Sequence, residues 1–390
     1  MIDELRRTCG EATFVAIMSG NFVERGSVAV ANKYVRAKAA MALGVDLVLS
    51  LPFPWCCASA EFFAHAGVAI AGSLAAALPD DEHILAFGSE CGDIEKLKLT
   101  GSRLASDGFR EKLSSLPASE RTARGIEQIY AETYPDGSCE LLRSPNNTLA
   151  VEYLRAIYEL GAKLSPVTVK RLGAAHDTDE SDVHPSASYV RERIFANENI
   201  AGLVPDAVYD ILTEEITAHG AARDESFGDA ILGILRMLSP ENADSFAECS
   251  GGVGRRLVSS ARASASLKDA LSLAATKQYT NARLRRAAVF AARGITADDL
   301  RALPEYTALL AANAKGTSAL RKLSRNAKIG ILTKSADAEK KLTESAKHQF
   351  DIDAQADALY TLAFDPHLPA DAFSRLSPYV TKNDLRKELL

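Results

Sequence analysis

Short apolar runs alternate with helical patterns over the first half of the chain. The run Phe14–Met18 has the length of a strand, and good helix formers follow it over Lys33–Leu43, just before Gly44. A second apolar run, Val45–Leu51, comes directly after this helix. A strand, a helix and a second strand in this order predict a right-handed βαβ unit with neighbouring parallel strands.

The same alternation continues to about residue 200. Two further apolar runs, Ile84–Phe87 and Val167–Leu172, have strand length, and helical patterns lie between them over Ala64–Leu78 and Leu149–Leu160. Apolar strands separated by helices are typical of a parallel sheet that is covered on both faces. The pattern therefore predicts an α/β domain, residues 1–200, built on a doubly wound, mainly parallel sheet.

The strand pattern fades after residue 200, and amphipathic helices separated by Gly, Pro and Asn replace it. We predict that residues 201–390 form a second, all-α domain. Two groups of basic residues lie in this half. The first surrounds Tyr279 and the second follows it along the chain: Lys277, Arg283, Arg285 and Arg286, then Lys315, Arg321, Lys322, Arg325 and Lys328.

Small and polar residues follow the predicted strands, as in Ser19–Asn21 and Gly88–Glu90. Ligands of parallel sheets bind beyond the carboxyl ends of the strands, where glycine lets backbone N–H groups approach a nucleotide. Two candidates, Gly88 and Arg171, lie at such ends, and a third, Asn147, lies in the turn before the helix Leu149–Leu160. Gly88 is either a turn glycine or a point of close approach, Asn147 is either a ligand contact or a helix cap, and Arg171 is a cation that requires a ligand or a buried partner.

Further polar residues have two interpretations each. Ser186 and Ser188 begin a helix and are capping residues by default, whereas Arg191, one turn later, is placed to meet a phosphate. His65, in the alanine-rich helix, is interpreted as structural. Five others belong either to the solvated surface or to the site, as rim or acid–base groups: Lys33, Arg36, Lys38, His176 and His184.

Composition narrows the class of protein. With 47% hydrophobic and 25% charged residues the chain is an ordinary globular protein, and no apolar run has the length of a membrane span. Met1 is not followed by the basic and apolar regions of a signal peptide, so we expect a cytoplasmic location and no membrane partner. The net charge of −6 argues against an overall basic surface but permits a local basic stripe. The six cysteines have no C-x-x-C spacing, so the sequence supports neither a zinc site nor a redox pair.

Six strings occur in order along the chain: MSGNFVERG, NKYVRAKAAMALGVDLVLSLPF, FGSE, SPNNTLAVEYL, VKRLGAAHD and SASYVR. Together they resemble the bacterial tRNA(Met) cytidine acetate ligase family, which belongs to the HxGH nucleotidyltransferase superfamily. The likeness extends weakly into the second half through TKQYTNARLRR. This resemblance implies an ATP-dependent ligase that activates acetate as acetyl-adenylate and acetylates N4 of the wobble cytidine of elongator tRNA(Met).

The resemblance also implies binding residues, although no catalytic group. ATP, bound with Mg²⁺, would be contacted by residues of four motifs. These are Gly88 in FGSE, Asn147 in SPNN, Arg171 and the following Leu172 in VKRL, and Ser188 and Arg191 in the serine-rich motif. The first basic group has the composition that RNA recognition requires, with cations for phosphates and an aromatic ring for a splayed base. Its expected tRNA contacts are Lys277, Tyr279, Arg283 and Arg286.

One part of the family pattern has no counterpart. The family begins with a strand and an NPFHNGH-type turn that grips ATP phosphates, and Met1 corresponds to the point just after it. We expect roughly 20 residues, the length of a strand, a turn and a first helical turn, to be absent, through a late start or through decay of a paralogue. Two other functions stay open: a small-molecule nucleotidyltransferase that acts without RNA, and a non-catalytic tRNA-binding protein with steep salt dependence.

Overall fold

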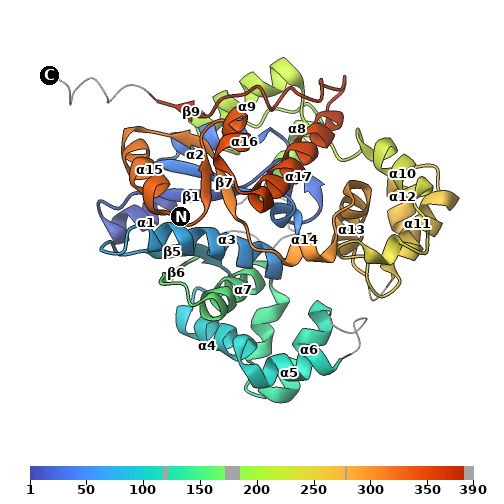
Figure 1. Cartoon of the computed structure of the whole chain (residues 1–390), viewed down its shortest axis with the longest axis horizontal. Coiled ribbons are helices and arrows are strands. Elements are labelled where there is room, and N and C mark those ends of the chain that lie inside the picture. Colours follow the sequence, from blue (N-terminus) through green and yellow to red (C-terminus); the bar gives the residue numbers. More distant parts are fainter. Residues whose placement is uncertain (117–121, 172–184, 277–278, 382–390) are drawn as a thin grey trace.

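The computed structural model describes residues 1–116, 122–171, 185–276 and 279–381 (Figure 1). Strand β1 (Val15–Ser19), helix α2 (Lys33–Ala42) and strand β4 (Leu47–Leu51) form the predicted βαβ unit, and β1 pairs in parallel with β4. Asn32 begins α2 because its side chain accepts hydrogen bonds from the backbone N–H groups of the first turn. Strand β4 is buried along its whole length, as its continuous apolar sequence predicts.

A strand from the second half completes this sheet. Strand β7 (Tyr306–Ala312) pairs antiparallel with β4, and two shorter strands, β8 (Gly330–Leu332) and β9 (Tyr379–Val380), pair in parallel with β7. The prediction that residues 201–390 contain helices only is therefore wrong at these strands. A short apolar run such as YTALLAA fits a buried strand and a buried helix equally well, and only the open side of β4 selects the strand.

Strands β5 (Ile84–Ser89) and β6 (Ser165–Lys170) form a second parallel pair. Helix α7 (Pro145–Leu160) packs against α3 (Ala60–Ala76) and α4 (Ile94–Ala105) beside this pair. Among the described strands, β1 pairs with β4 and β5 pairs with β6, but β1 and β5 do not pair with each other. The mixed α/β class and the mainly parallel sheet are confirmed.

The remaining helices surround these strands or form the two ends of the molecule in Figure 1, where α4–α6 lie below the sheet and α10–α12 lie at the right. A small hairpin, β2 (Phe22–Val23) and β3 (Ser27–Val28), follows β1. The other helices are α1 (Ile2–Cys9), α5 (Asp107–Ser115), α6 (Ala123–Thr133), α8 (Ala187–Phe195), α9 (Asp206–His219), α10 (Gly228–Met237), α11 (Val253–Ala263), α12 (Leu267–Ala274), α13 (Asn281–Arg293), α14 (Ala297–Arg301), α15 (Ala314–Asn326), α16 (Ala338–Lys341) and α17 (Glu344–Tyr360).

One aromatic core joins the two halves of the chain. The Phe53 ring, in the loop after β4, lies 5.6 Å from Phe22 of the hairpin and 5.7 Å from Phe290 of α13, measured between centroids. The buried Trp55 indole donates a hydrogen bond to the carbonyl of Ala302 at 2.9 Å. The domain boundary at residue 200 remains a prediction, and the main apolar core extends across it. No helix in the described ranges is long and apolar enough to cross a membrane.

Candidate functional site

The loop after β5 and the start of α7 hold each other through reciprocal hydrogen bonds. The Glu90 carboxylate accepts from the backbone N–H of Asn147 at 2.6 Å and from the backbone and side-chain nitrogens of Asn146 at 3.0 and 2.7 Å. In return, the buried Asn147 side-chain oxygen accepts from the N–H groups of Glu90 and Cys91, both at 3.0 Å. Burial alone would raise the pKa of Glu90, but these hydrogen bonds lower it.

This arrangement decides between the two interpretations of Asn147. Ser144 precedes α7 without a capping hydrogen bond from its side chain, and Glu90 occupies the helix N-terminus instead. Asn147 therefore does not cap its own helix. Its side chain shapes the turn that follows β5, which begins at Glu90, two residues after Gly88 in the strand.

Arg171 lies over this turn from the end of β6. Its N–H donates to the carbonyl of Ser89 at 2.9 Å, and a Cβ built on Gly88 would lie 3.4 Å from the Arg171 Cγ. The guanidinium is exposed, and its hydrogen-bond partner among the described residues is the side-chain oxygen of Asn146 at 3.5 Å. Gly88, Asn147 and Arg171 thus come together from β5, α7 and β6, with a cation that is accessible to an anionic ligand.

The serine-rich segment supplies a second cationic spot. Ser186 caps α8 by accepting from the N–H of Tyr189, and Ser188 accepts from the Arg191 guanidinium at 3.0 Å. Burial and the nearby charge of Arg25, in the hairpin after β1, lower the pKa of Arg191. Two neighbouring guanidinium groups attract an anion, so this segment suits a phosphate.

Beneath the turn after β1 lies a buried ionic network that the sequence did not reveal. The Lys33 ammonium lies 2.6 Å from the Asp357 carboxylate and 3.5 Å from Asp353, and all three groups are almost completely buried. Asn21 donates to Asp357 at 2.8 Å and accepts from the N–H of Lys33 at 2.7 Å. Burial would lower the pKa of Lys33, but the two carboxylates outweigh it and raise the pKa. The assignment of Lys33 to the surface or the rim is therefore wrong.

Arg36 and Lys38, the other two cations of α2, also have partners within the protein. The Arg36 guanidinium donates to the carbonyls of Ser19 and Gly20 and so supports the turn that ends β1. Lys38 is half-exposed and forms an ion pair with Glu214 at 3.3 Å. Only Lys38 has the surface position that we expected for these residues.

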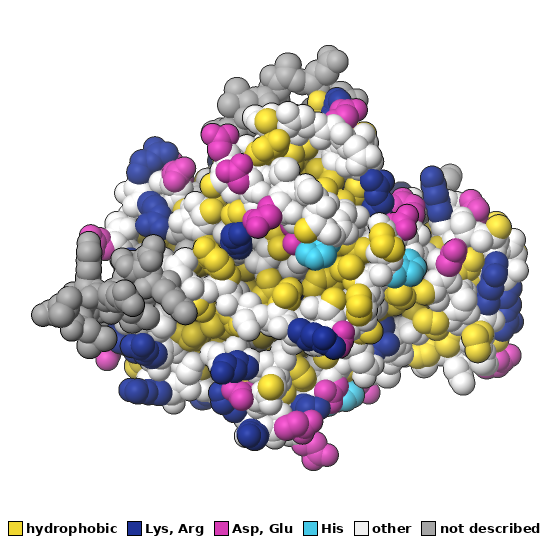
Figure 2. Space-filling model, turned by 90° about the horizontal axis from the view of Figure 1, so that it is seen from above, with side chains coloured by type: hydrophobic (Ala, Val, Ile, Leu, Met, Phe, Trp, Pro, Cys, Tyr) yellow, Lys and Arg dark blue, Asp and Glu magenta, His cyan; other side chains and the backbone are white. Residues whose placement is uncertain are grey.

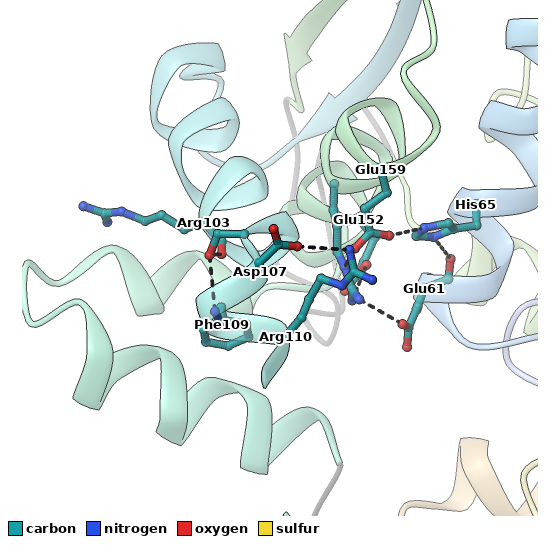
Figure 3. A network of polar contacts seen from close by, with 10 residues as sticks. Glu61, His65, Arg103, Asp107, Phe109, Arg110, Glu152 and Glu159 are labelled. Atoms are coloured by element: carbon teal, nitrogen blue, oxygen red, sulfur yellow. Dashed lines mark hydrogen bonds and ion pairs between the residues drawn. The ribbon is translucent and has the colours of Figure 1, made fainter. Parts of the chain in front are cut away.

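His65 belongs to an ionic network between α3 and α7 (Figure 3). Its ring Nδ1 donates to the carbonyl of Glu61 at 3.0 Å, and its Nε2 pairs with the Glu159 carboxylate at 2.5 Å. Arg155 lies among three carboxylates, with Glu159 at 3.0 Å, Glu61 at 3.2 Å and Glu152 at 3.5 Å. These partners agree with the structural interpretation of His65.

The start of α13 brings together part of the first basic group. The Arg283 guanidinium lies 5.3 Å from the centroid of the Tyr279 ring, whose hydroxyl donates to the carbonyl of Gly251 at 2.8 Å. Arg286 points inward instead and donates two hydrogen bonds of 3.0 Å to the Glu248 carboxylate. Burial would lower the pKa of Arg286, but Glu248 outweighs burial and raises it. Arg286 therefore has an internal partner, whereas Arg283 and Tyr279 are accessible.

The second basic group lies elsewhere. Figure 1 places α15 and α13 on opposite sides of the molecule. On α15 the side chains of Arg321, Lys322 and Arg325 are exposed, whereas Lys315 donates to the carbonyls of Glu11 and Ala12 at 2.9 Å. The face seen in Figure 2 shows Lys and Arg side chains scattered among acidic and apolar ones rather than in one band.

Several sequence candidates lie outside the described residues: Leu172, His176, His184 and Lys277. Two useful residues were missed by sequence reasoning. Glu90 is visible in the FGSE string, but its partners are more than fifty positions away, so no local pattern connects them. Asp357 follows Asp353 by one helical turn, a spacing that marks a shared face without naming Lys33 as the partner. The described residues contain no group of three or more His, Cys, Asp or Glu side chains that could hold a metal ion.

Comparison with known proteins identifies the family of this chain. The model of the family HIGH Nucleotidyl Transferase matches residues 1–372. A tRNA(Met) cytidine acetate ligase of Caldicellulosiruptor bescii is 32% identical over 82% of this chain and 79% of its own length. Another from Acetivibrio thermocellus is 28% identical over 93% of this chain and 91% of its own length.

Solved structures show the same fold. The crystal structure of Thermotoga maritima TmcAL without ligand superposes with a TM-score of 0.86 at 24% identity, covering 97% of this chain and 95% of that one. The same protein bound with alpha-thio ATP has a TM-score of 0.84 at 24% identity. Family model, relatives and ordered motifs agree, and the chain belongs to the tRNA(Met) cytidine acetate ligases within the HIGH nucleotidyltransferase family.

Proposed function

We propose that this protein is an ATP-dependent ligase that acetylates N4 of the wobble cytidine in elongator tRNA(Met). Family membership supports the ligase class, and relatives named for tRNA(Met) support the RNA substrate. The observation that carries the proposal is the meeting of Gly88, Asn147 and Arg171 at the carboxyl ends of β5 and β6. We place the activity in the cytoplasm, together with its substrates ATP, acetate and tRNA.

The proposed reaction has two steps. An acetate oxygen attacks the α-phosphorus of ATP in line, which forms acetyl-adenylate and releases pyrophosphate. The cytidine N4 amine then attacks the acetyl carbonyl carbon, AMP leaves, and a proton is lost from N4. Both steps need charge stabilisation and positioning more than covalent help from side chains.

The residues at the strand ends fit the first step. Gly88 has no side chain, so a nucleotide can approach the backbone of the turn, and Asn147 holds the turn in its conformation. Arg171 offers an exposed guanidinium that contacts Asn146 at 3.5 Å among the described residues, and Ser188 with Arg191 forms the second cationic spot. Mg²⁺ would enter with the ATP phosphates, and Leu172, next to Arg171, completes the proposed ATP contacts.

The start of α13 fits the RNA. Tyr279 provides a ring on which an unstacked base can lie, and Arg283 provides a cation for the adjoining phosphate. Lys277 precedes them in sequence and joins this proposed surface. Arg286 is not proposed as an RNA contact, because its guanidinium is engaged by Glu248 inside the protein.

The test is acetylation of bacterial tRNA by the full chain with ATP and labelled acetate, followed by nucleoside analysis. N4-acetylcytidine at the wobble position of elongator tRNA(Met), with one pyrophosphate released per acetyl group, is the expected result. The variant Arg171→Ala should lose this activity, whereas Arg110→Ala, an exposed arginine on α5, should keep it.

Two other outcomes identify the alternatives. Pyrophosphate release that is independent of RNA would point to a small-molecule nucleotidyltransferase. tRNA binding with no affinity for ATP would identify a tRNA-binding protein without ATP chemistry.

A further inference from the structure

The β2–β3 hairpin connects the turn after β1 to helix α13. It follows directly from the turn after β1, and its tip residue Gly26 has φ +73°. A Cβ on Gly26 would lie 2.6 Å from the backbone nitrogen of Arg286 and 2.9 Å from the backbone carbon of Arg285. Backbone therefore packs on backbone, and no side chain fits at this contact.

Polar contacts fix the same junction. The Arg285 guanidinium donates to the Ser27 hydroxyl at 3.0 Å, and it lies 4.0 Å from the Asp224 carboxylate. Asp224 in turn accepts from the N–H of Val28 at 2.9 Å. The second strand of the hairpin is thus tied to α13 directly through Ser27 and indirectly through Asp224.

Both ends of this connection lead to a proposed substrate contact. Arg25, next to the tip, is close enough to Arg191 of α8 for the two charges to interact. On the other side, Arg283 lies in the first turn of α13, two residues before Arg285, and its guanidinium lies over the ring of Tyr279, which precedes the helix. At a rise of about 1.5 Å per residue, Arg283 lies only about 3 Å along the helix axis from Arg285, which contacts the hairpin.

The hairpin is anchored firmly at its base. The Phe22 ring is buried and lies 5.6 Å from Phe53 and 6.4 Å from Tyr360, between centroids. Phe53 also contacts Phe290 in the last turns of α13. A hairpin held at its base and fitted to α13 at its tip can set the position of the helix relative to the strand ends.

We infer that the hairpin 22–28 positions the RNA-binding helix α13 against the nucleotide site, with Arg285 and Ser27 as positioning residues that touch neither substrate. This inference rests on the proposed function. It predicts that loss of the junction slows acetyl transfer while tRNA and ATP still bind, since a small misplacement of reacting groups affects the rate more than the binding.

The test compares Arg285→Ala, Ser27→Ala and the double variant in the full chain. Each single change should lower kcat at saturating tRNA and ATP by roughly 3- to 30-fold, the range of coupling through positioning residues. The dissociation constants for tRNA and ATP should stay within about threefold, and the double variant should be no slower than Arg285→Ala because both changes remove one contact. Arg285→Lys should recover part of the rate.

Gly26→Ala provides an independent variant, because its methyl group forces the hairpin away from α13 and should lower kcat by roughly tenfold or more. If this variant does not fold, the Arg285 and Ser27 cycle decides alone. A weaker tRNA affinity in Arg285→Ala with a neutral Ser27→Ala would overturn the inference in favour of direct RNA contact, and unchanged kcat in all variants would also overturn it. Wild-type protein that forms no N4-acetylcytidine would instead reject the proposed function itself.

Discussion

Glu90 and Asn147 each hold the backbone of the other. The Glu90 carboxylate accepts the N–H of Asn147 at 2.6 Å, and the Asn147 side-chain oxygen accepts the N–H of Glu90 at 3.0 Å. This pair joins the turn after β5 to the start of α7 and so defines the surface beside Gly88. Replacing Glu90 by glutamine removes the charge from this pair while it keeps the shape of the side chain.

Glu90→Gln should lower the free energy of unfolding by about 2 kcal/mol, because Asn146 and Asn147 donate hydrogen bonds to a charged carboxylate. In the variant, the NH₂ group of glutamine would face one of these N–H donors and could not accept a hydrogen bond from it. Since these bonds hold the pKa of Glu90 below its usual 4.5, the contribution is complete above that pH and is lost as the pH falls through the lower folded value. Urea unfolding at pH 7 and pH 3 measures the difference. Glu95→Gln, an exposed control on α4, should change little at either pH.

Arg171→Ala should weaken ATP binding by roughly tenfold to a hundredfold, the effect of losing a charge-assisted contact of about 1.5–3 kcal/mol. The melting temperature should hardly change, since the guanidinium is exposed and its one contact among the described residues, with Asn146, is as long as 3.5 Å. Titration calorimetry with ATP gives the affinity, and Arg110→Ala is the matched exposed arginine. An unchanged ATP affinity would remove Arg171 from the proposed site.

Lys33→Met should cost about 3–5 kcal/mol, because it leaves the carboxylates of Asp353 and Asp357 buried without their cation. Burial raises the pKa of Asp357 above its usual 3.8, so the folded variant binds protons that the unfolded chain releases. The loss should therefore be largest at pH 8 and smaller at pH 5. Lys38→Met breaks only a half-exposed pair and should cost less than about 1 kcal/mol; an equal loss in both variants would contradict the burial argument.

His65→Gln should show the opposite dependence on pH. Burial lowers the pKa of His65, but the hydrogen bond and charge of Glu159 outweigh it and raise the pKa above 6.5. The stabilisation by the charged pair is thus complete below pH 6.5 and is lost as the pH rises through the folded value. Unfolding at pH 6 and pH 9 should show a loss of about 1–2 kcal/mol that is present only at the lower pH. In a Glu159→Gln background this difference should disappear.

Arg283→Ala should weaken tRNA binding and reduce the slope of log affinity against log salt by about one, as expected for one lost phosphate contact. Filter binding at several salt concentrations measures both quantities. Arg325→Ala, an exposed arginine on α15 at the opposite side of Figure 1, is the control and should leave the slope unchanged. If only the α15 variant changes the slope, the RNA lies on the other face.

The local sequence determined much of the fold. Apolar strand-length runs and capped helices appear where the periodicity predicts them, from the βαβ unit β1–α2–β4 to the β5–β6 pair. The fully buried β4 has the continuous apolar sequence that burial on both faces requires. The ordered motifs also identified the family and marked Gly88, Asn147 and Arg171 as neighbours of strand ends. These features depend on residues that lie close together in the chain.

Tertiary structure decided which distant residues meet. The run YTALLAA becomes β7 only because β4 offers an unpaired edge, and Lys33 is buried only because α17 brings Asp353 and Asp357 over it. Arg283 and Arg286 look alike in sequence, yet Arg286 forms hydrogen bonds with Glu248 inside the protein, whereas Arg283 lies over the ring of Tyr279 and is accessible. Local patterns encode the backbone and the apolar face of each element, whereas the partner of a charge depends on long-range packing that no local pattern contains.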